Sequence, residues 1–145
     1  MFKHILVPID GSPTSELAVD KAIGMAKAFD SAVTAIYVVD PYPFTGVGEG
    51  FAFGQGQYLI AAKAHATQSL ANARKQMEQA GVKITTATVE AHSPWRGILE
   101  AADSGGADLI VMGSHGRSGV EKLVMGSVAQ RVISHTKLPV LLIRA

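Results

Sequence analysis

The stretch ADLIVMGSHGRSGVEKLVMGSV, residues 107–128, joins a short apolar run to a turn that is rich in glycine. The apolar run, residues 107–112, has the length of a strand, and a continuous run of this kind is typical of a strand buried within a sheet. Glycines follow at positions 113 and 116, and Gly126 stands directly before Ser127, where a helical pattern begins. A buried strand that leads through glycines to a helix indicates an α/β fold. It also makes the glycine-rich turn a candidate for a function beyond connecting the two elements.

The same alternation of apolar runs and helical patterns extends over the rest of the chain. The predicted strands cover residues 3–10, 31–39, 82–91, 107–112 and 139–145, and the predicted helices cover 13–29, 58–80, 94–105 and 126–135. Strands that alternate with helices predict a mainly parallel sheet. We therefore expect one domain, residues 1–145, with five strands in a doubly wound open sheet and helices on both faces. The more polar strand at 82–91 is expected at an edge.

Residues 41–57, PYPFTGVGEGFAFGQGQ, interrupt this alternation. Five glycines and two prolines predict an irregular loop, while the aromatic residues at 42, 44, 51 and 53 are too apolar for a plain linker. Long loops inside compact domains usually serve as functional lids, as partner contacts or as disordered segments. The pattern leaves two interpretations open: a lid, or a mobile loop whose aromatic side chains cover the neighbouring core.

The composition excludes several classes of function. Hydrophobic residues make up 48% and charged residues 17% of the 145 positions, which is typical of an ordered core. The net charge of +1 and the scattered lysines and arginines argue against a nucleic-acid partner. Without cysteine there is no disulfide and no cysteine-ligated zinc. No apolar run has the length of a membrane span or of a signal-peptide core, so we expect a cytoplasmic protein without a membrane contact.

Two strand ends carry residues suited to a phosphate chain. In open α/β sheets ligands bind at the carboxyl ends of the strands, where the winding changes direction. Asp10 follows the first strand, and Gly113 and Gly116 follow the fourth. Glycines leave backbone N–H groups uncovered, and the helix that starts at Gly126 and Ser127 offers further unpaired N–H groups and its positive dipole end. The residues between 116 and 126 leave room for a short helix in VEKLVM (120–125).

Each of these residues also has a purely structural interpretation. Gly113 taken alone is better explained by a turn or by close packing, whereas three glycines together with Ser127 favour a nucleotide site. Asp10 either caps the turn that follows it or takes part in the site, and the sequence leaves both open. A bare carboxylate repels phosphates, so Asp10 in the site would contact the sugar or act through Mg²⁺.

Several enzyme motifs are absent from the sequence. It contains no G-x-x-x-x-G-K-[ST], no G-x-G-x-x-G after the first strand, no catalytic triad, and no metal-ligand spacing among its five histidines. Phosphoryl transfer needs a group that orients the nucleophile and charges that clamp the γ-phosphate. His115 and Arg117 are the nearby candidates, and neither has an evident orienting partner in the sequence. We therefore favour nucleotide binding over turnover, and expect neither a catalytic residue nor a protein-bound metal.

Four motifs in order resemble the universal stress protein family. They are ILVPIDGS (5–12), DLIVMGSHGRSG (108–119), the pattern G-x2-G-x9-G-S from 113 to 127, and GSVAQRV…LPVLLI (126–143). The resemblance implies a sheet ordered 3-2-1-4-5 of the adenine nucleotide alpha hydrolase-like type. It also implies a homodimer through the last strand, Pro139–Ala145, and, for members with this glycine pattern, bound ATP, with Mg²⁺ as a possible companion.

The resemblance also implies a role for each matching position. Val7, Pro8 and Asp10 are expected to line the adenosine end, with Asp10 near the ribose or a hydrated metal ion. Val39 is expected to contact the adenine through its backbone. Met112 and Gly113 are expected to border the ribose. The residues expected to hold the phosphates are Gly116, Arg117, Gly126, Ser127 and Val128.

These expectations together describe an ATP-binding regulatory or stress-response module that acts on a protein partner not identified by the sequence. Two alternatives remain beside it. One is a slow ATPase, and the other is a structural dimer that binds no nucleotide. The sequence does not distinguish ATP from AMP or another adenine nucleotide.

Overall fold

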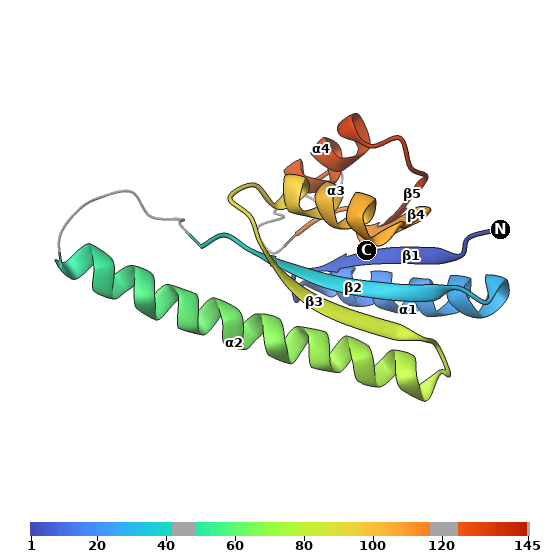
Figure 1. Cartoon of the computed structure of the whole chain (residues 1–145), viewed down its shortest axis with the longest axis horizontal. Helices are drawn as coiled ribbons and strands as arrows, with labels where there is room; N and C mark the ends of the chain where they lie inside the picture. The colour runs from blue at the N-terminus through green and yellow to red at the C-terminus, as the bar shows by residue number, and fades with distance from the viewer. Residues whose placement is uncertain (42–48, 117–124, 145) are drawn as a thin grey trace.

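The computed structural model describes residues 1–41, 49–116 and 125–144, with backbone alone at 49–53. Five parallel strands form one sheet in the order β3-β2-β1-β4-β5, which confirms the predicted order (Figure 1). The strands are β1 (His4–Ile9), β2 (Ala32–Val39), β3 (Ile84–Glu90), β4 (Leu109–Gly113) and β5 (Val140–Ile143). The helices are α1 (Pro13–Phe29), α2 (Glu49–Gln79), α3 (Pro94–Gly105) and α4 (Ser127–His135). Among the described residues, no helix combines the length and apolarity that a membrane crossing requires.

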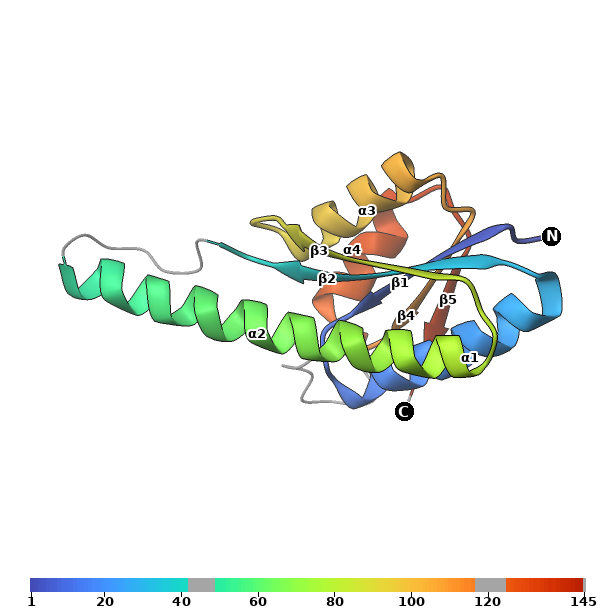
Figure 2. The same cartoon turned by 60° about the horizontal axis from the view of Figure 1, so that its bottom comes forward.

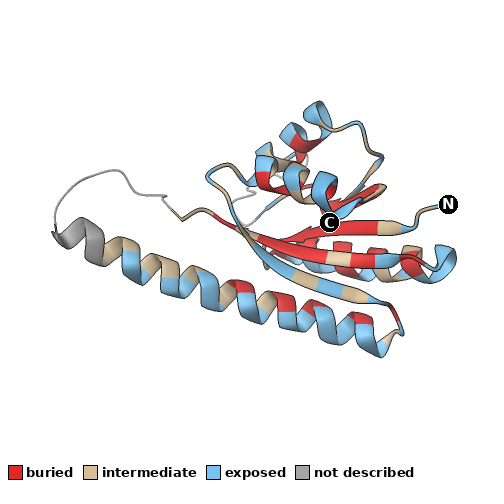
Figure 3. Cartoon of the chain, in the orientation of Figure 1, coloured by how far each residue is buried: buried red, intermediate tan, exposed pale blue. Residues whose placement is uncertain are grey.

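The helices cover both faces of the sheet. Helices α1 and α2 lie on one face and α3 and α4 on the other (Figures 1 and 2). Side chains alternate between the two faces along each strand, so Ile5 and Val7 of β1 pack under α1 and α2 while Leu6 packs under α3 and α4. The central strands are therefore buried on both faces, as Figure 3 shows, while β3 forms a half-exposed edge as predicted.

Local capping explains where α1 begins and ends. The side chain of Ser12 accepts a hydrogen bond from the Ser15 amide at 3.3 Å, and Pro13 occupies the first helical position, where no N–H is needed. Asp30 ends the helix in the left-handed region at φ 55°, and its amide donates to the carbonyl of Ala26. The predicted range of this helix, 13–29, is confirmed.

Helix α2 begins at Glu49, so the loop predicted over 41–57 is wrong for residues 49–57. Glycine costs a helix about 1 kcal/mol relative to alanine, which is too little to stop one that is already nucleated, because each further residue adds a backbone hydrogen bond. The Gln55 side chain also donates to the carbonyl of Pro41 at 2.9 Å, which ties this part of α2 to the end of β2. Residues 42–48 lie outside the described part, and the lid interpretation of that segment stays a prediction.

The glycines within α2 allow a direct test of this helix start. A Cβ added at Gly54 or at Gly56 meets no atom within 4 Å. We expect Gly54→Ala and Gly56→Ala each to raise the free energy of unfolding by roughly 0.5–1 kcal/mol, measured by urea denaturation. Gly81→Ala is the matched control, because Gly81 also faces open space but has φ +77°, so this variant should be less stable. A loss of stability at positions 54 and 56 would contradict a helix there.

At the amino ends of the strands, Asp108 joins β4 to β1. Its carboxylate accepts hydrogen bonds from the amides of Lys3 at 2.9 Å and His4 at 3.1 Å. Desolvation acts to raise the pKa of Asp108, but these hydrogen bonds outweigh it and hold the pKa below its ordinary value. The stabilisation is therefore present at neutral pH and is lost as the pH falls through the lowered pKa.

Candidate functional site

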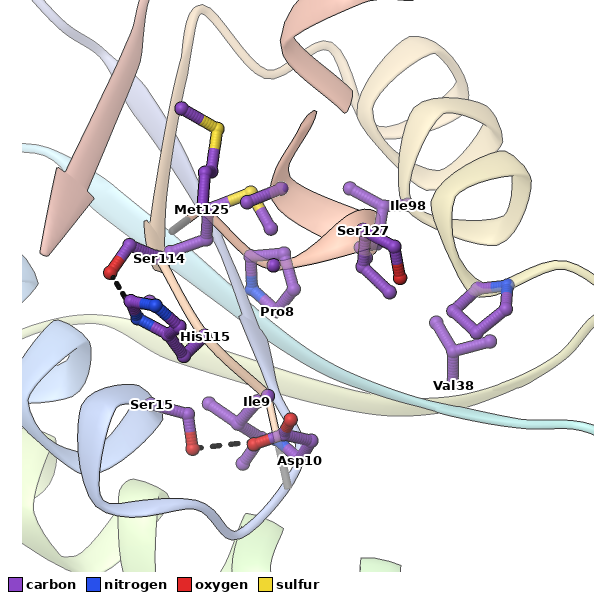
Figure 4. A pocket seen from close by; sticks show the side chains of 17 residues that line it. Pro8, Ile9, Asp10, Ser15, Val38, Ile98, Ser114, His115, Met125 and Ser127 are labelled. Atoms are coloured by element: carbon purple, nitrogen blue, oxygen red, sulfur yellow. Dashed lines mark hydrogen bonds between the residues drawn. The ribbon is translucent and has the colours of Figure 1, made fainter. Parts of the chain in front are cut away.

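A cavity of about 510 Å³ opens at the carboxyl ends of β1 and β4. These two strands are neighbours, and the winding changes direction between them, since β2 and β3 follow on the side of β1 while β5 follows on the side of β4. The first residues of α3 and α4 form another wall (Figure 4). This is the position at which open α/β sheets bind ligands. The predicted site residues that line it are Pro8, Asp10, Met112, Gly113, Gly116, Gly126, Ser127 and Val128.

Three predicted site residues are not among the described residues that line the cavity. The side chains of Val7 and Val39 are 0% and 2% exposed and belong to the core beneath α1 and α2. Alternation along β2 brings Val38 to the cavity instead. The carbonyl of Val39 accepts a hydrogen bond from the Ala91 amide, and the predicted backbone contact of Val39 with adenine stays a prediction. Arg117 lies outside the described residues.

The structure adds lining residues that were not among the predicted binding residues, although His115 was considered as a candidate for phosphoryl transfer. They are Ile9, Ser15, Val38, Pro94, Ile98, Ser114, His115, Met125 and Ala129. Four of them, Ser15, Pro94, Ile98 and Ala129, lie in the first turns of α1, α3 and α4, where no glycine or acidic residue marks a binding site in the sequence. The Ser93-Pro94 pair was a usable signal, because it starts a helix directly after a strand and all helices of a parallel sheet start at the ligand-binding edge.

Asp10 shapes the turn after β1 and also lines the cavity. Its Oδ1 accepts a hydrogen bond from the Ser12 amide at 2.9 Å, which is the turn-capping role that the sequence left open. Its backbone N–H donates to Ser15 Oγ at 3.4 Å, and its carbonyl accepts from the Tyr37 hydroxyl at 3.4 Å. The backbone at Asp10 is thus held from two elements, while its carboxylate belongs to the cavity wall.

The missing side chains of Gly113 and Gly126 allow close contacts within the protein. A Cβ at Gly113 would lie 2.6 Å from Thr14 Oγ1 and 3.0 Å from the Thr14 carbonyl carbon. The same Thr14 hydroxyl donates to the carbonyl of His115. A Cβ at Gly126 would lie 3.0 Å from the Ser114 carbonyl oxygen, to which the Gly126 amide donates at 2.7 Å. These glycines therefore bring the turn after β4 against the starts of α1 and α4.

The start of α4 presents to the cavity amides that have no acceptor within the helix. Gly126 is the N-cap residue, and no side chain caps this helix. By helix geometry the N–H groups of Ser127, Val128 and Ala129 have no acceptor within the helix, and all three residues line the cavity. Such a helix start binds anions, because its N–H groups and its dipole both favour negative charge. No lysine or arginine is found among the described lining residues, so the amides and hydroxyls are the donors available there.

The cavity has an apolar part as well. Val38 and Ile98 lie on one side of it, away from Ser114 and His115 (Figure 4). Pro94 extends this apolar wall. A flat, largely apolar group can bury its faces against such side chains while a polar tail reaches the amides of α4.

His115 has a side-chain contact with the residue directly before it, which was not predicted from the sequence. Its Nδ1 lies 2.9 Å from the Ser114 hydroxyl, and its Nε2 is buried without a hydrogen-bond partner in the described structure. A hydroxyl can orient an imidazole but does not strengthen it as a base in the way a carboxylate does. Within residues 1–41, 49–116 and 125–144 there is also no group of three or more potential metal ligands. The described geometry therefore suits binding better than acid–base catalysis.

Comparisons with known proteins point to one family. The family model described as "Universal stress protein family" matches residues 1–144. A universal stress protein of Methanocaldococcus jannaschii is 41% identical over 144 residues, which are 99% of this chain and 83% of that protein. The structure of the universal stress protein UspA from Lactobacillus plantarum has a TM-score of 0.87 at 26% identity, covering 98% of this chain and 97% of its own. A universal stress protein solved in complex with cAMP has a TM-score of 0.69 at 28% identity and covers 99% of this chain and 97% of its own.

Proposed function

Because the chain belongs to the universal stress protein family, we propose that it binds ATP in the cavity between β1 and β4 and acts as a nucleotide-dependent regulatory module. The observation that carries the proposal is the start of α4, where the first residues line that cavity and have amides without an acceptor in the helix. The relative solved in complex with cAMP supports an adenine nucleotide as the class of ligand. The cytoplasmic location expected from the sequence stays a prediction.

The residues present fit the parts of this ligand. The amides of Ser127 and Val128 would donate to phosphate oxygens, and the apolar wall at Val38 and Ile98 would receive the adenine ring. Asp10 would accept hydrogen bonds from the ribose hydroxyls. Mg²⁺ binds oxygen ligands and keeps several waters, so it would be held by the phosphates, and Asp10 is the carboxylate that the described lining residues offer to its waters.

Binding without efficient hydrolysis is the form of the proposal that the geometry favours. Phosphoryl transfer needs clamping charges and an oriented nucleophile. The described lining residues supply His115 with only a hydroxyl partner and no cationic side chain. A slow ATPase therefore remains the second candidate, and phosphate release separates it from pure binding.

A thermal-shift titration tests the proposed ligand. A ligand at one hundred times its Kd stabilises the folded state by about 2.7 kcal/mol, which moves the melting temperature by several degrees. We expect this shift with ATP and Mg²⁺ and a smaller one with GTP at equal concentration. The absence of a shift with ATP, AMP and cAMP would overturn the nucleotide proposal. A structural dimer that binds no nucleotide would then be the remaining interpretation of the function.

We further propose a homodimer through β5. This strand forms an edge of the sheet, and Leu141 on it is 37% exposed, which leaves an apolar edge open to pairing. The wild type should show twice the chain mass of 15.2 kDa by light scattering at micromolar concentration. Leu141→Arg should shift it to the monomer, because a charge on an edge strand opposes edge-to-edge pairing. A monomeric wild type would contradict the proposal.

A further inference from the structure

A cluster of aromatic and cationic side chains joins α3 to α4. Trp95, the single tryptophan of the chain, is half-buried there. The ring of His135 lies over it with centroids 4.4 Å apart and an angle of 31° between the planes. The guanidinium carbons of Arg96 and Arg131 lie 5.0 and 5.9 Å from the centroid of the Trp95 ring. We call Trp95, Arg96, Arg131 and His135 the Trp95 surface.

The two guanidinium groups of the Trp95 surface lack an anionic partner within the described structure. None of the ion pairs found there includes Arg96 or Arg131. Glu100 stands one helical turn after Arg96, at the spacing that usually forms a pair, yet the two are not paired. A guanidinium over an aromatic ring keeps its in-plane N–H donors free, so both arginines can still form charge-assisted hydrogen bonds.

The Trp95 surface is held in place before any partner arrives. His135 Nδ1 donates to the carbonyl of Arg131 at 2.9 Å, because a carbonyl can only accept. This bond fixes the imidazole against the ring of Trp95, while cation–π contacts restrain the arginines. Two like charges gathered around one ring repel each other, and an anion bound to both would relieve that repulsion.

The chemistry of the Trp95 surface favours an acidic peptide over a nucleic acid. Single-stranded nucleic acids stack their bases on open aromatic faces, whereas the ring of Trp95 is already engaged by His135 and two arginines. The net charge of +1 is also low for a nucleic-acid binder. In an extended peptide, carboxylates on alternate residues lie about 7 Å apart on one side, which suits two arginines around a single ring.

We propose that the Trp95 surface docks an acidic, extended segment of a partner protein. The carboxylates of the segment bind Arg96 and Arg131. This docking does not require the proposed nucleotide function. The surface nevertheless adjoins the cavity, since Pro94 and Ser127 line the cavity and begin the two helices that carry the surface.

The single tryptophan makes the test direct. A short peptide of alternating glutamate and glycine, without aromatic residues, is titrated into the full chain without nucleotide. We expect a saturable change in the fluorescence of Trp95, and the same Kd from the anisotropy of a labelled copy of the peptide. The double variant Arg96→Gln/Arg131→Gln should weaken binding of the labelled peptide at least about tenfold, or roughly 1.4 kcal/mol. The matched control Lys21→Gln/Lys27→Gln removes equal charge from exposed positions of α1, on the other face of the sheet, and should bind like the wild type.

Three further titrations distinguish an acidic peptide from other ligands of the Trp95 surface. Inorganic phosphate, an oligothymidylate and a lysine–glycine peptide replace the acidic peptide, each at about 0.15 M salt. Circular dichroism and thermal melting confirm that the variants fold. The proposal is overturned by the absence of saturable peptide binding, by equal losses in the two double variants, or by tighter binding of the oligothymidylate or phosphate. A change in melting temperature without any change in peptide affinity would make the cluster a contact between helices only.

Discussion

Gly113→Ala is expected to lower the free energy of unfolding by about 3 kcal/mol, at the upper end of what overpacking usually costs. The new Cβ would lie 2.6 Å from Thr14 Oγ1 and 3.0 Å from the Thr14 carbonyl carbon. A side chain can rotate away, but the backbone of Thr14 sits in the first turn of α1 and is fixed by its cap. The contact is therefore relieved only if α1 moves away from β4, which disturbs a buried core on that face.

Urea denaturation of Gly113→Ala beside Gly116→Ala separates this effect from a general cost of filling the turn. A Cβ at Gly116 would approach the Oδ2 atom of Asp10 at 2.9 Å, and this is a side-chain atom that can move at the cost of the hydrogen bond between Asp10 Oδ1 and the Ser12 amide. We expect Gly116→Ala to lose less than half of the stability that Gly113→Ala loses. Equal stability of the two variants would show that the approach of α1 to Gly113 is not as close as the structure places it.

The glycines show how far sequence reasoning reached into the site. The pattern from Gly113 to Ser127 identified the right turn, because glycines after a buried strand are easy to recognise. Their contacts were not predictable: the atom that excludes a side chain at Gly113 belongs to Thr14, far away in the sequence. For Gly113 taken alone the sequence favoured a turn or close packing over a ligand, and the contact with Thr14 identifies the packing partner as α1.

The spacing of apolar residues explains which other structural predictions were confirmed and which were wrong. The apolar face of α2 was predictable from spacing alone, because Ala66, Leu70 and Met77 recur at helical intervals in the sequence, and all three are buried. The start of α2 was not, because glycines lower helix propensity without excluding a helix. Val39 was the predicted site residue at the end of β2, whereas the side chain that lines the cavity is that of Val38. Neighbouring residues of a strand point to opposite faces of the sheet, and the sequence does not show which face the cavity occupies.

The proposed contact between phosphates and the start of α4 leads to an expected result in which stability and binding change in opposite directions. Ser127 is exposed, lines the cavity and occupies the first position of α4. In Ser127→Glu the new carboxylate lies at the positive end of the helix dipole, so the free energy of unfolding should rise by about 0.3–1 kcal/mol. The same charge would stand within a few ångströms of a bound phosphate. Because two charges about 4 Å apart interact by about 4 kcal/mol near a protein surface, the affinity for ATP should fall at least a hundredfold.

Calorimetric titration of Ser127→Glu and Ser127→Gln with ATP and with adenosine tests this charge effect. Glutamine has the size of glutamate without its charge, so Ser127→Gln should keep its ATP affinity within about tenfold of the wild type, or roughly 1.4 kcal/mol. Adenosine carries no phosphate, and its affinity should be nearly equal in the two variants. If glutamate and glutamine reduce ATP affinity by the same factor, bulk rather than charge is responsible, and the phosphates do not lie at the amides of α4. If Ser127→Glu binds ATP as tightly as the wild type, the nucleotide lies elsewhere in the protein.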